Sequence, residues 1–189
     1  IPDLIRKFRA SHGDVFFRIL DRRESISWDI CIRSTLPEVL FSNAVKLMDE
    51  ELLLACWRDS RLAEKKRITL SDLSNEDFIA LKEGGSLREI SDKRFQELGF
   101  IPQVAYECDN HYILKRMVEE GLGVAIWPEY SWRRQLEREE ENPYVCLRPL
   151  DIPNFTRSLY LIRQKDIKMT REMEDFLKFT EGYFSAMNK

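Results

Sequence analysis

The feature that most constrains this chain is a repeated order of apolar segment, amphipathic segment and glycine. Residues 78–81 are apolar, and the apolar side chains of the following segment, 87–98, recur at helical spacing. Gly99 comes next, as glycine commonly does where a helix ends. The same order returns over residues 104–121, and a further apolar segment follows at 123–127. Strands that alternate with helices indicate an α/β fold with a mostly parallel sheet.

The rest of the chain extends this pattern. Helical spacing predicts a first helix over residues 1–8, before Gly13, and a last helix from 168 to the end. Charged segments at 59–72 and 133–142 are expected at the surface. Further strands are expected at 15–20, 28–32, 44–48, 52–57, 144–147 and 158–163, with an acidic turn at 49–51. About nine strands and five helices fit two small lobes better than one doubly wound sheet.

Composition excludes several classes of protein. Hydrophobic residues make up 43% of the 189 residues and charged residues 33%, a mix that can bury enough apolar surface to fold. The longest apolar run, 52–57, is far shorter than the ~20 residues of a membrane span, and no signal peptide opens the sequence. The net charge of −3 argues against a free-standing nucleic-acid binder, which normally carries a basic excess.

Four cysteines lie far apart, at Cys31, Cys56, Cys108 and Cys146. No CxxC pair is present, so their spacing matches neither a zinc site nor a dense disulfide framework. We interpret all four as reduced thiols packed in strands or at strand ends, where cysteine acts as a small hydrophobic residue. Reduced thiols indicate a cytoplasmic protein.

Catalytic motifs are missing from the sequence. It contains no GxSxG, HExxH, GxxxxGK[ST] or GxGxxG pattern, and its only histidines are His12 and His111. A triad or metal cluster built on histidine therefore has little material, and His12 is expected at the surface. We predict no enzymatic activity, no metal site and no cofactor.

Three polar segments each follow a predicted strand: Arg33-Ser-Thr35, Gly84-Gly-Ser86 and Asp109-Asn110. Taken singly, each is explained as a turn or a helix N-cap, with Ser86 and either Asp109 or Asn110 as caps. Taken together, they lie where α/β proteins bind ligands, beyond strand carboxyl ends and beside helix N-termini with unpaired N–H groups. Without a nucleophile–base pair, such groups indicate a binding site rather than a catalytic one.

Several motifs occur in a recognisable order. The most specific is Met117-Val-Glu-Glu-Gly-Leu-Gly-Val-Ala-Ile-Trp-Pro128. The others are Ile1-Pro-Asp-Leu-Ile-Arg-Lys-Phe8, Trp28-Asp-Ile-Cys-Ile32, Ile68-Thr-Leu-Ser-Asp-Leu73, Phe78-Ile-Ala-Leu81, Gly85-Ser86, Phe95-Gln-Glu-Leu-Gly-Phe100, Pro102 and Leu147-Arg-Pro-Leu150. In this order, and over nearly the whole chain, they resemble the effector-binding domain of LysR-type transcriptional regulators.

The resemblance implies two Rossmann-like α/β lobes joined by crossover strands, as in type 2 periplasmic solute-binding proteins. Lobe I would comprise residues 1–50 and 130–189, and lobe II residues 51–129. The crossovers would fall near Glu50–Leu54 and Ile126–Tyr130. A small-molecule effector in the cleft between the lobes would shift the lobes and the oligomer, and thereby the DNA contacts of the regulator.

The resemblance also implies parts that this sequence lacks. The chain opens on a helix without the family's first strand, which indicates a fragment of a longer protein. The winged helix-turn-helix that binds DNA in this family is absent from this chain, and residues 21–27 are too short for a helix that the family usually has there. Family members form homodimers or tetramers, and the helix 109–120 and the strand 42–48 suit a two-fold dimer interface.

The effector site is expected to be shared between the lobes. Lobe I would supply Arg33, Ser34 and Thr35, and lobe II would supply Gly85, Ser86, Asn110 and His111. The helix N-termini favour an anion such as a carboxylate. Arg33 would clamp this anion, and His111 would donate a hydrogen bond with a charge that varies near neutral pH. The alternative is that Arg33 pairs with a neighbouring carboxylate and His111 packs on a helix cap.

Gly121 and Gly123 are expected to be glycine because of the backbone conformation, and Gly121 should have a positive φ after a helix.

Two other classes of protein stay open. A secreted solute-binding protein would share the fold but has no signal sequence here in its favour. An enzyme of unrecognised type would need paired titratable groups, which the predicted site lacks.

Overall fold

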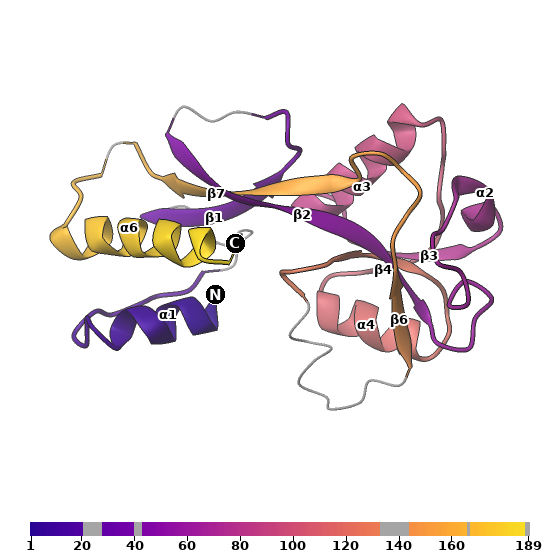
Figure 1. Cartoon of the computed structure of the whole chain (residues 1–189), viewed down its shortest axis with the longest axis horizontal. Helices are drawn as coiled ribbons and strands as arrows, with labels where there is room; N and C mark the ends of the chain where they lie inside the picture. The colour runs from indigo at the N-terminus through magenta and orange to yellow at the C-terminus, as the bar shows by residue number, and fades with distance from the viewer. Residues whose placement is uncertain (21–27, 40–42, 133–143, 166, 188–189) are drawn as a thin grey trace. The chain divides into compact units, whose positions relative to one another are not determined.

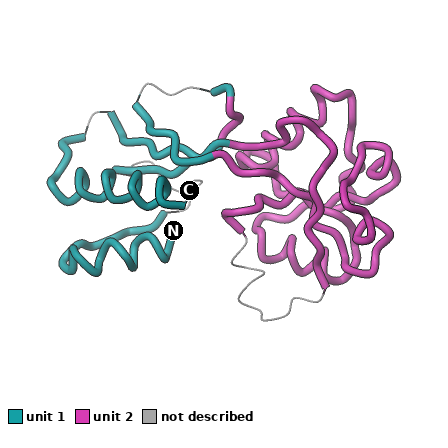
Figure 2. The backbone as a smooth tube through the Cα atoms, viewed as in Figure 1, with its two compact units in different colours: residues 1–34, 38–48, 158–189 teal, residues 35–37, 49–157 magenta. Residues whose placement is uncertain are grey.

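The longest strand, β2 (Ala44–Trp57), passes from one compact unit of the chain into a second. The computed structural model describes residues 1–20, 28–39, 43–132, 144–165 and 167–187. Unit 1 contains residues 1–34, 38–48 and 158–189, and unit 2 contains residues 35–37 and 49–157 (Figure 2). The strand β7 (Thr156–Arg163) also crosses this division, between residues 157 and 158. This second division falls later in the chain than the crossover expected near 126–130.

Unit 2 contains the parallel strands that the sequence predicts. β3 (Asp77–Leu81) pairs in parallel with β4 (Gln103–Cys108), and Phe78 forms a parallel bridge with Val124, just before β5 (Ala125–Pro128). The helices α3 (Ser86–Glu97) and α4 (His111–Glu119) follow β3 and β4 in the chain (Figure 1). Gly99 and Gly121 come after these helices with φ of +66° and +70°, which confirms the predicted helix ends.

β2 departs from the parallel pattern. It pairs antiparallel with β5 from Leu52↔Pro128 to Ala55↔Ala125, and with β6 (Val145–Arg148) from Leu54↔Arg148 to Trp57↔Val145. The prediction of a mostly parallel sheet is therefore wrong for this strand. The predicted break at the acidic turn 49–51 is also wrong, because β2 is a single strand of 14 residues that includes residues 49–51. Glu50 can stay in the strand because its buried carboxylate pairs with Arg157 at 2.6 Å.

Two apolar clusters form the core of unit 2. In the first, the ring of Phe95 on α3 lies 5.9 Å from that of Phe78 and 5.1 Å from those of Phe100 and Phe155. In the second, the fully buried Trp127 packs among residues that include Leu114 and Val118 of α4. These contacts bury the faces of α3 and α4 that carry the helical apolar pattern.

The buried face of α4 is not purely apolar. Ile113 is 44% exposed. Lys115 and Glu119 are buried instead, and their side chains pair at 3.2 Å. The two residues are one helical turn apart on the buried face of α4, and they can be buried there because each charge neutralises the other.

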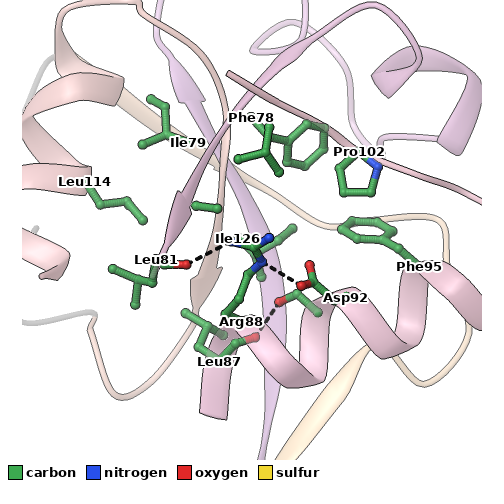
Figure 3. Close-up of a pocket in the computed structure, with 13 residues that line it drawn as sticks. Phe78, Ile79, Leu81, Leu87, Arg88, Asp92, Phe95, Pro102, Leu114 and Ile126 are labelled. Atoms are coloured by element: carbon green, nitrogen blue, oxygen red, sulfur yellow. Dashed lines mark hydrogen bonds and ion pairs between the residues drawn. The ribbon is translucent and has the colours of Figure 1, made fainter. Parts of the chain in front are cut away.

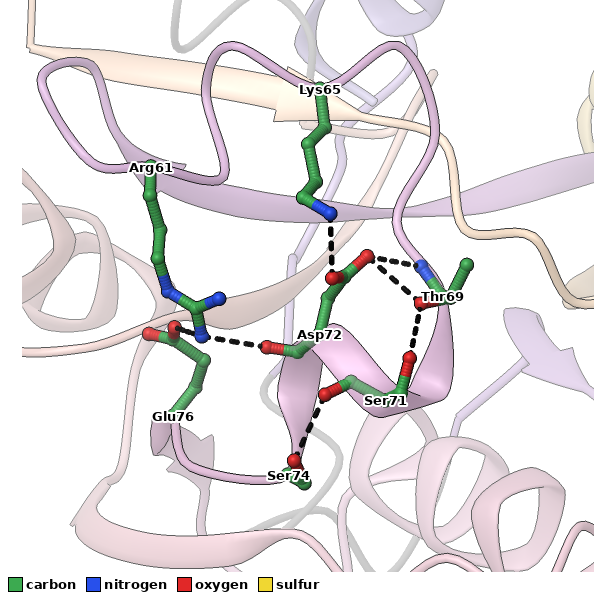
Figure 4. Close-up of polar contacts among 7 residues, drawn as sticks. All are labelled: Arg61, Lys65, Thr69, Ser71, Asp72, Ser74 and Glu76. Atoms are coloured by element: carbon green, nitrogen blue, oxygen red, sulfur yellow. Dashed lines mark hydrogen bonds and ion pairs between the residues drawn. The ribbon is translucent and has the colours of Figure 1, made fainter.

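The charged segment 59–72 is only partly at the surface. Leu62 and Ile68 are fully buried, and residues Leu70–Leu73 form the short helix α2. Polar contacts hold the start of this helix (Figure 4). The carboxylate of Asp72 accepts hydrogen bonds from the backbone N–H of Thr69 at 3.0 Å and from Lys65 Nζ at 2.7 Å. The charged side chains thus face solvent while the aliphatic ones enter the core.

Unit 1 contains two helices and one end of the larger sheet. α1 (Pro2–Arg9) and α6 (Arg171–Ser185) lie side by side (Figure 1), with the fully buried Phe8 ring 5.1 Å from that of Phe176. In the sheet the strand order is β1-β7-β2-β5, with β6 also paired to β2, and β1 spans Ile30–Thr35. α6 begins after the predicted start at 168, because Thr170 Oγ1 accepts a hydrogen bond from the N–H of Met173 at 3.3 Å and caps the helix.

Two predictions near the start of the chain are wrong. Residues 15–20 are not a strand, since no described strand pairs with them, and Phe16 and Ile19 are 87% and 67% exposed. The segment Arg33–Thr35 belongs to β1 and is not a turn after it.

The predictions about residues 21–27, residue 42 and residues 133–142 lie outside the described residues. None of the described helices combines the length and the apolar character needed to cross a membrane.

Candidate functional site

The carboxyl ends of the parallel strands of unit 2 meet at one edge. Leu81 at the end of β3 is paired with Cys108 at the end of β4, and the backbone N–H of Lys82 donates to the carbonyl of Cys108 at 2.8 Å. On the other side of β3, the N–H of Ile79 donates to the carbonyl of Val124 at 2.8 Å. The loops after β3, β4 and β5 therefore leave the sheet at the same edge, where α/β proteins bind ligands.

The first loop leads into α3 through two glycines. Gly84 has a φ of +81°, a conformation that glycine adopts without strain, and Gly85 is the N-cap residue. The prediction of Ser86 as the cap is wrong by one residue, since Ser86 is the first residue of the helix. Because Gly85 has no side chain, no side-chain hydrogen bond caps this end of α3. The N-terminus of α3, with its partial positive charge and its first N–H groups, therefore lies at this edge.

The second loop places Asn110 as the N-cap of α4, which is one of the two residues, Asp109 and Asn110, that the sequence offered as the cap. Its Oδ1 accepts a hydrogen bond from the backbone N–H of Ile113 at 2.9 Å, and its Nδ2 donates to Asp109 Oδ1 at 2.9 Å. The capping alternative for Asn110 therefore holds in this structure. One amide hydrogen of Nδ2 is engaged by Asp109, and an amide carries two.

An aromatic cluster flanks the start of α4. The ring of His111 lies 5.3 Å from that of Trp132, and Trp132 lies edge-on to Trp127 at 5.0 Å. Burial lowers the pKa of His111 from its usual value, so the imidazole is neutral at neutral pH. The predicted change of charge therefore moves to a more acidic pH. Trp127 Nε1 is buried without a hydrogen-bond partner among the described residues.

A buried ion pair anchors the third loop. Ser131 donates from its backbone N–H at 2.8 Å and from its hydroxyl at 2.7 Å to the two carboxylate oxygens of Glu50. Arg157 Nε donates to Glu50 Oε1 at 2.6 Å, and both side chains are buried. Because Ser131 adjoins Trp132, this network holds the aromatic cluster in place.

Sequence reasoning missed Trp127, Trp132, Ser131 and Glu50. One signal was available, because the loop after the strand ending at Pro128 follows the same rule as the other two loops. Glu50 gave no such signal, since its partners lie 81 and 107 residues away in sequence.

The predicted residues Arg33 and Ser34 belong to unit 1, while Thr35 begins the short segment 35–37 assigned to unit 2. Ser34 is buried in β1. Arg33 Nε is buried without a hydrogen-bond partner, and no carboxylate pairs with Arg33 in the described part of the chain. The alternative of a neighbouring carboxylate partner for Arg33 thus finds no support among these residues.

A pocket lies between α3 and the strands β3 and β4, and its walls are mostly apolar (Figure 3). Its one cation among the lining residues, Arg88, donates to Asp92 Oδ2 at 2.6 Å, to the carbonyl of Leu81 at 3.1 Å and to Glu107 Oε2 at 3.2 Å. Two carboxylates therefore already balance this charge, and the remaining walls, such as Phe95, belong to the core. This pocket is a poorer anion site than the edge of the parallel strands. Among the described residues, no group of three or more His, Cys, Asp or Glu side chains could hold a metal ion.

The sequence as a whole matches a known family. The model of the LysR substrate binding domain covers residues 1–185. The chain belongs to this family. GltC of Bacillus subtilis strain 168, a transcriptional dual regulator, is 28% identical to this LysR domain over 198 residues, which cover all of the chain and 64% of GltC. The chain therefore spans less than two-thirds of the length of that relative.

Solved structures confirm the predicted fold. The regulatory domain of Synechocystis PCC6803 CcmR in complex with 2-PG matches with a TM-score of 0.81 and 20% identity, over 98% of this chain and 91% of that one. The effector-binding domain of QuiR in complex with shikimate matches with a TM-score of 0.76 and 21% identity, over 98% and 90% of the two chains. This LysR domain thus has the two-lobed α/β fold of type 2 periplasmic binding proteins.

Proposed function

We propose that this LysR domain senses a small anionic effector, bound where the parallel strands of unit 2 end. The observation that carries the proposal is the convergence of the N-termini of α3 and α4 at one edge, which follows from the parallel pairing of β3 with β4. Two positive helix ends stabilise an anion more than one does. The related domains of CcmR and QuiR are seen with small ligands, 2-PG and shikimate, and support a small effector here.

Each predicted residue has a role in this proposal. Gly85 lets a ligand approach the backbone of α3, Ser86 and the remaining amide hydrogen of Asn110 donate to the anion, and His111 with Trp132 forms an apolar flank. Arg33, Ser34 and Thr35 stay proposed effector ligands, and Arg33 would supply a positive charge. The Nε of Arg33, which is buried without a hydrogen-bond partner, supports this role, because a buried donor that stays unpaired is costly.

A thermal-shift screen of small metabolite carboxylates tests the proposal. A ligand at 100 times its Kd stabilises the fold by about 2.7 kcal/mol, which raises the Tm of a chain of this size by roughly 5–10 °C. The variants S86A and N110S should weaken binding, and N110S keeps a capping oxygen so that α4 stays intact. The control S74A removes a hydroxyl that bonds the carbonyl of Ser71 at the end of α2. A ligand whose affinity is unchanged in both S86A and N110S would place the site elsewhere.

For the whole protein we propose transcription regulation in the cytoplasm, with DNA bound by a winged helix-turn-helix outside this sequence. GltC, a transcriptional regulator that extends beyond the matched region, supports this assignment over an enzyme. We also propose a homodimer through α4, within the predicted 109–120, and through residues 44–48 of β2, the described part of the predicted 42–48. Tyr112, Ile113 and Val45 favour it, since these apolar side chains are 63%, 44% and 42% exposed. Sedimentation equilibrium should show a dimer that Y112E weakens, whereas a monomer at high concentration would contradict the interface.

A further inference from the structure

Two of the four cysteines face each other across a pair of strands. Cys56 of β2 and Cys146 of β6 are directly opposite in the antiparallel register. Two residues further along, the N–H of Arg58 donates to the carbonyl of Tyr144 at 2.8 Å, which makes those two a hydrogen-bonded pair. Because such pairs recur every second residue, Cys56 and Cys146 form one too, with a Cα separation of about 5.5 Å. This value falls inside the roughly 4.4–6.8 Å that disulfides span.

The two thiols also share one face of the sheet. Directly opposed residues of antiparallel strands point to the same side. Cys56 Sγ donates a weak hydrogen bond to the carbonyl oxygen of Cys146 at 3.7 Å, so the sulfur lies beside the residue opposite. Cys108 has a different setting, since its Sγ donates to the carbonyls of Ala80 and Asn110 at 3.7 and 3.5 Å. No other pair of cysteines is opposed in the described strand registers.

Exposure differs between the two thiols. Cys56 is completely buried, and this burial raises its pKa, while Cys146 is half-buried. A reagent from solution therefore reaches Cys146 first. The buried Cys56 can therefore react only with a group already attached to the sulfur of Cys146.

We propose that Cys56 and Cys146 form a reversible disulfide through exchange with a low-molecular-weight disulfide such as oxidised glutathione. The thiolate of Cys146 attacks the reagent, forming a mixed disulfide and releasing one glutathione thiolate. The thiolate of Cys56 then attacks the Cys146 sulfur of that mixed disulfide, forming the protein disulfide and releasing the second glutathione. Two protein thiols are oxidised, one glutathione disulfide is reduced to two thiols, and two protons balance the products.

The bridge would tie β6 to β2 and close the chain over residues 56–146, which include β3, β4, β5, α3 and α4. A cross-link that closes a long loop stabilises a fold mainly by restricting the unfolded chain. Oxidation should therefore raise the Tm of unit 2. This inference is independent of the proposed effector site, because neither cysteine belongs to it.

The test equilibrates the reduced chain with glutathione buffers of increasing oxidised fraction, followed by acid quenching, alkylation and peptide mapping. We expect a species about 2 Da lighter, with one Cys56–Cys146 peptide pair, that dithiothreitol reverses. The double variant C31S/C108S should oxidise as the native chain does, and C146S should give no intramolecular bridge. The Tm of the oxidised chain should rise by roughly 5 °C or more, and this rise should vanish in C146S.

Three results would overturn the inference. They are free thiols at both positions in a hundredfold excess of oxidised glutathione, a bridge to Cys31 or Cys108, and a mixed disulfide on Cys146 that never resolves. Peptide mapping of the native chain decides among them, so the test does not depend on any variant folding.

Discussion

Replacing Gly123 with alanine should destabilise unit 2 strongly, because the backbone of β3 occupies the space that a Cβ would need. A Cβ at this position would overlap the carbonyl oxygen of Asp77, and it would lie 3.1 Å from the Asp77 carbonyl carbon and 3.3 Å from Ile79 Cγ1. The same carbonyl oxygen accepts the hydrogen bond from the N–H of Val124 at 2.9 Å. The strain therefore falls on a sheet contact rather than on a movable side chain.

The size of the effect follows from two terms. Overfilling a packed site costs roughly 1–3 kcal/mol, and weakening one buried backbone hydrogen bond costs about 1 kcal/mol more. The sum of about 2–4 kcal/mol corresponds to a fall in Tm of roughly 4–16 °C for a chain of this length.

Thermal unfolding followed by circular dichroism measures this change, with G182A as the control. Gly182 lies within α6, where a Cβ meets nothing within 4 Å. Alanine there should stabilise the helix by about 0.5–1 kcal/mol, so the two variants should shift the Tm in opposite directions. A G123A protein that melts with the native chain would show that β3 and residue 123 are not in contact as described.

Three further predictions concern single residues of unit 2. G121V should cost more than about 1 kcal/mol in denaturant unfolding, because a β-branched residue is strained at a φ of +70°; an unchanged midpoint would mean that α4 ends elsewhere. E50A should cost roughly 3–5 kcal/mol because it removes the carboxylate that neutralises the buried Arg157, and the double variant E50L/R157M should recover much of this loss; equal losses would refute the pairing. The contact with Lys65 and the hydrogen bonds from Thr69 lower the pKa of Asp72 to about 2, so its contribution of about 1 kcal/mol is complete above pH ~4 and lost as the pH falls through 2. D72N should therefore be less stable than the native chain at pH 5 and nearly equal to it at pH 2, and a difference that does not depend on pH would contradict this assignment.

The parts of the fold that local pattern governs could be predicted from the sequence. Gly99 and Gly121 end helices because the turn after each helix needs a positive φ, and that requirement is visible in a single residue. The cap of α4 could be narrowed to Asp109 or Asn110 because capping is also local, and the side chain of Asn110 accepts a hydrogen bond from a backbone group three residues away.

Contacts between distant parts of the chain could not be predicted in this way. The acidic triplet at 49–51 has the composition of a turn, and Glu50 remains in a strand because the distant Arg157 and Ser131 bind its carboxylate. Residues 15–20 have the composition of a strand, yet composition does not provide a neighbouring strand for their backbone to pair with. In the candidate site, Trp132 could not be predicted because its position depends on the hydrogen bond between Ser131 and Glu50, which are far apart in sequence.

Binding of an anion at the N-termini of α3 and α4 can be followed residue by residue by nuclear magnetic resonance. The ¹⁵N-labelled chain would be titrated with the carboxylate that raises the Tm most in the screen. We expect saturable shifts of the backbone amides of Ser86–Arg88 and His111–Ile113, with the same Kd as the thermal data. Shifts confined to the pocket beside Phe95 and Val104, with the two helix N-termini unchanged, would contradict it.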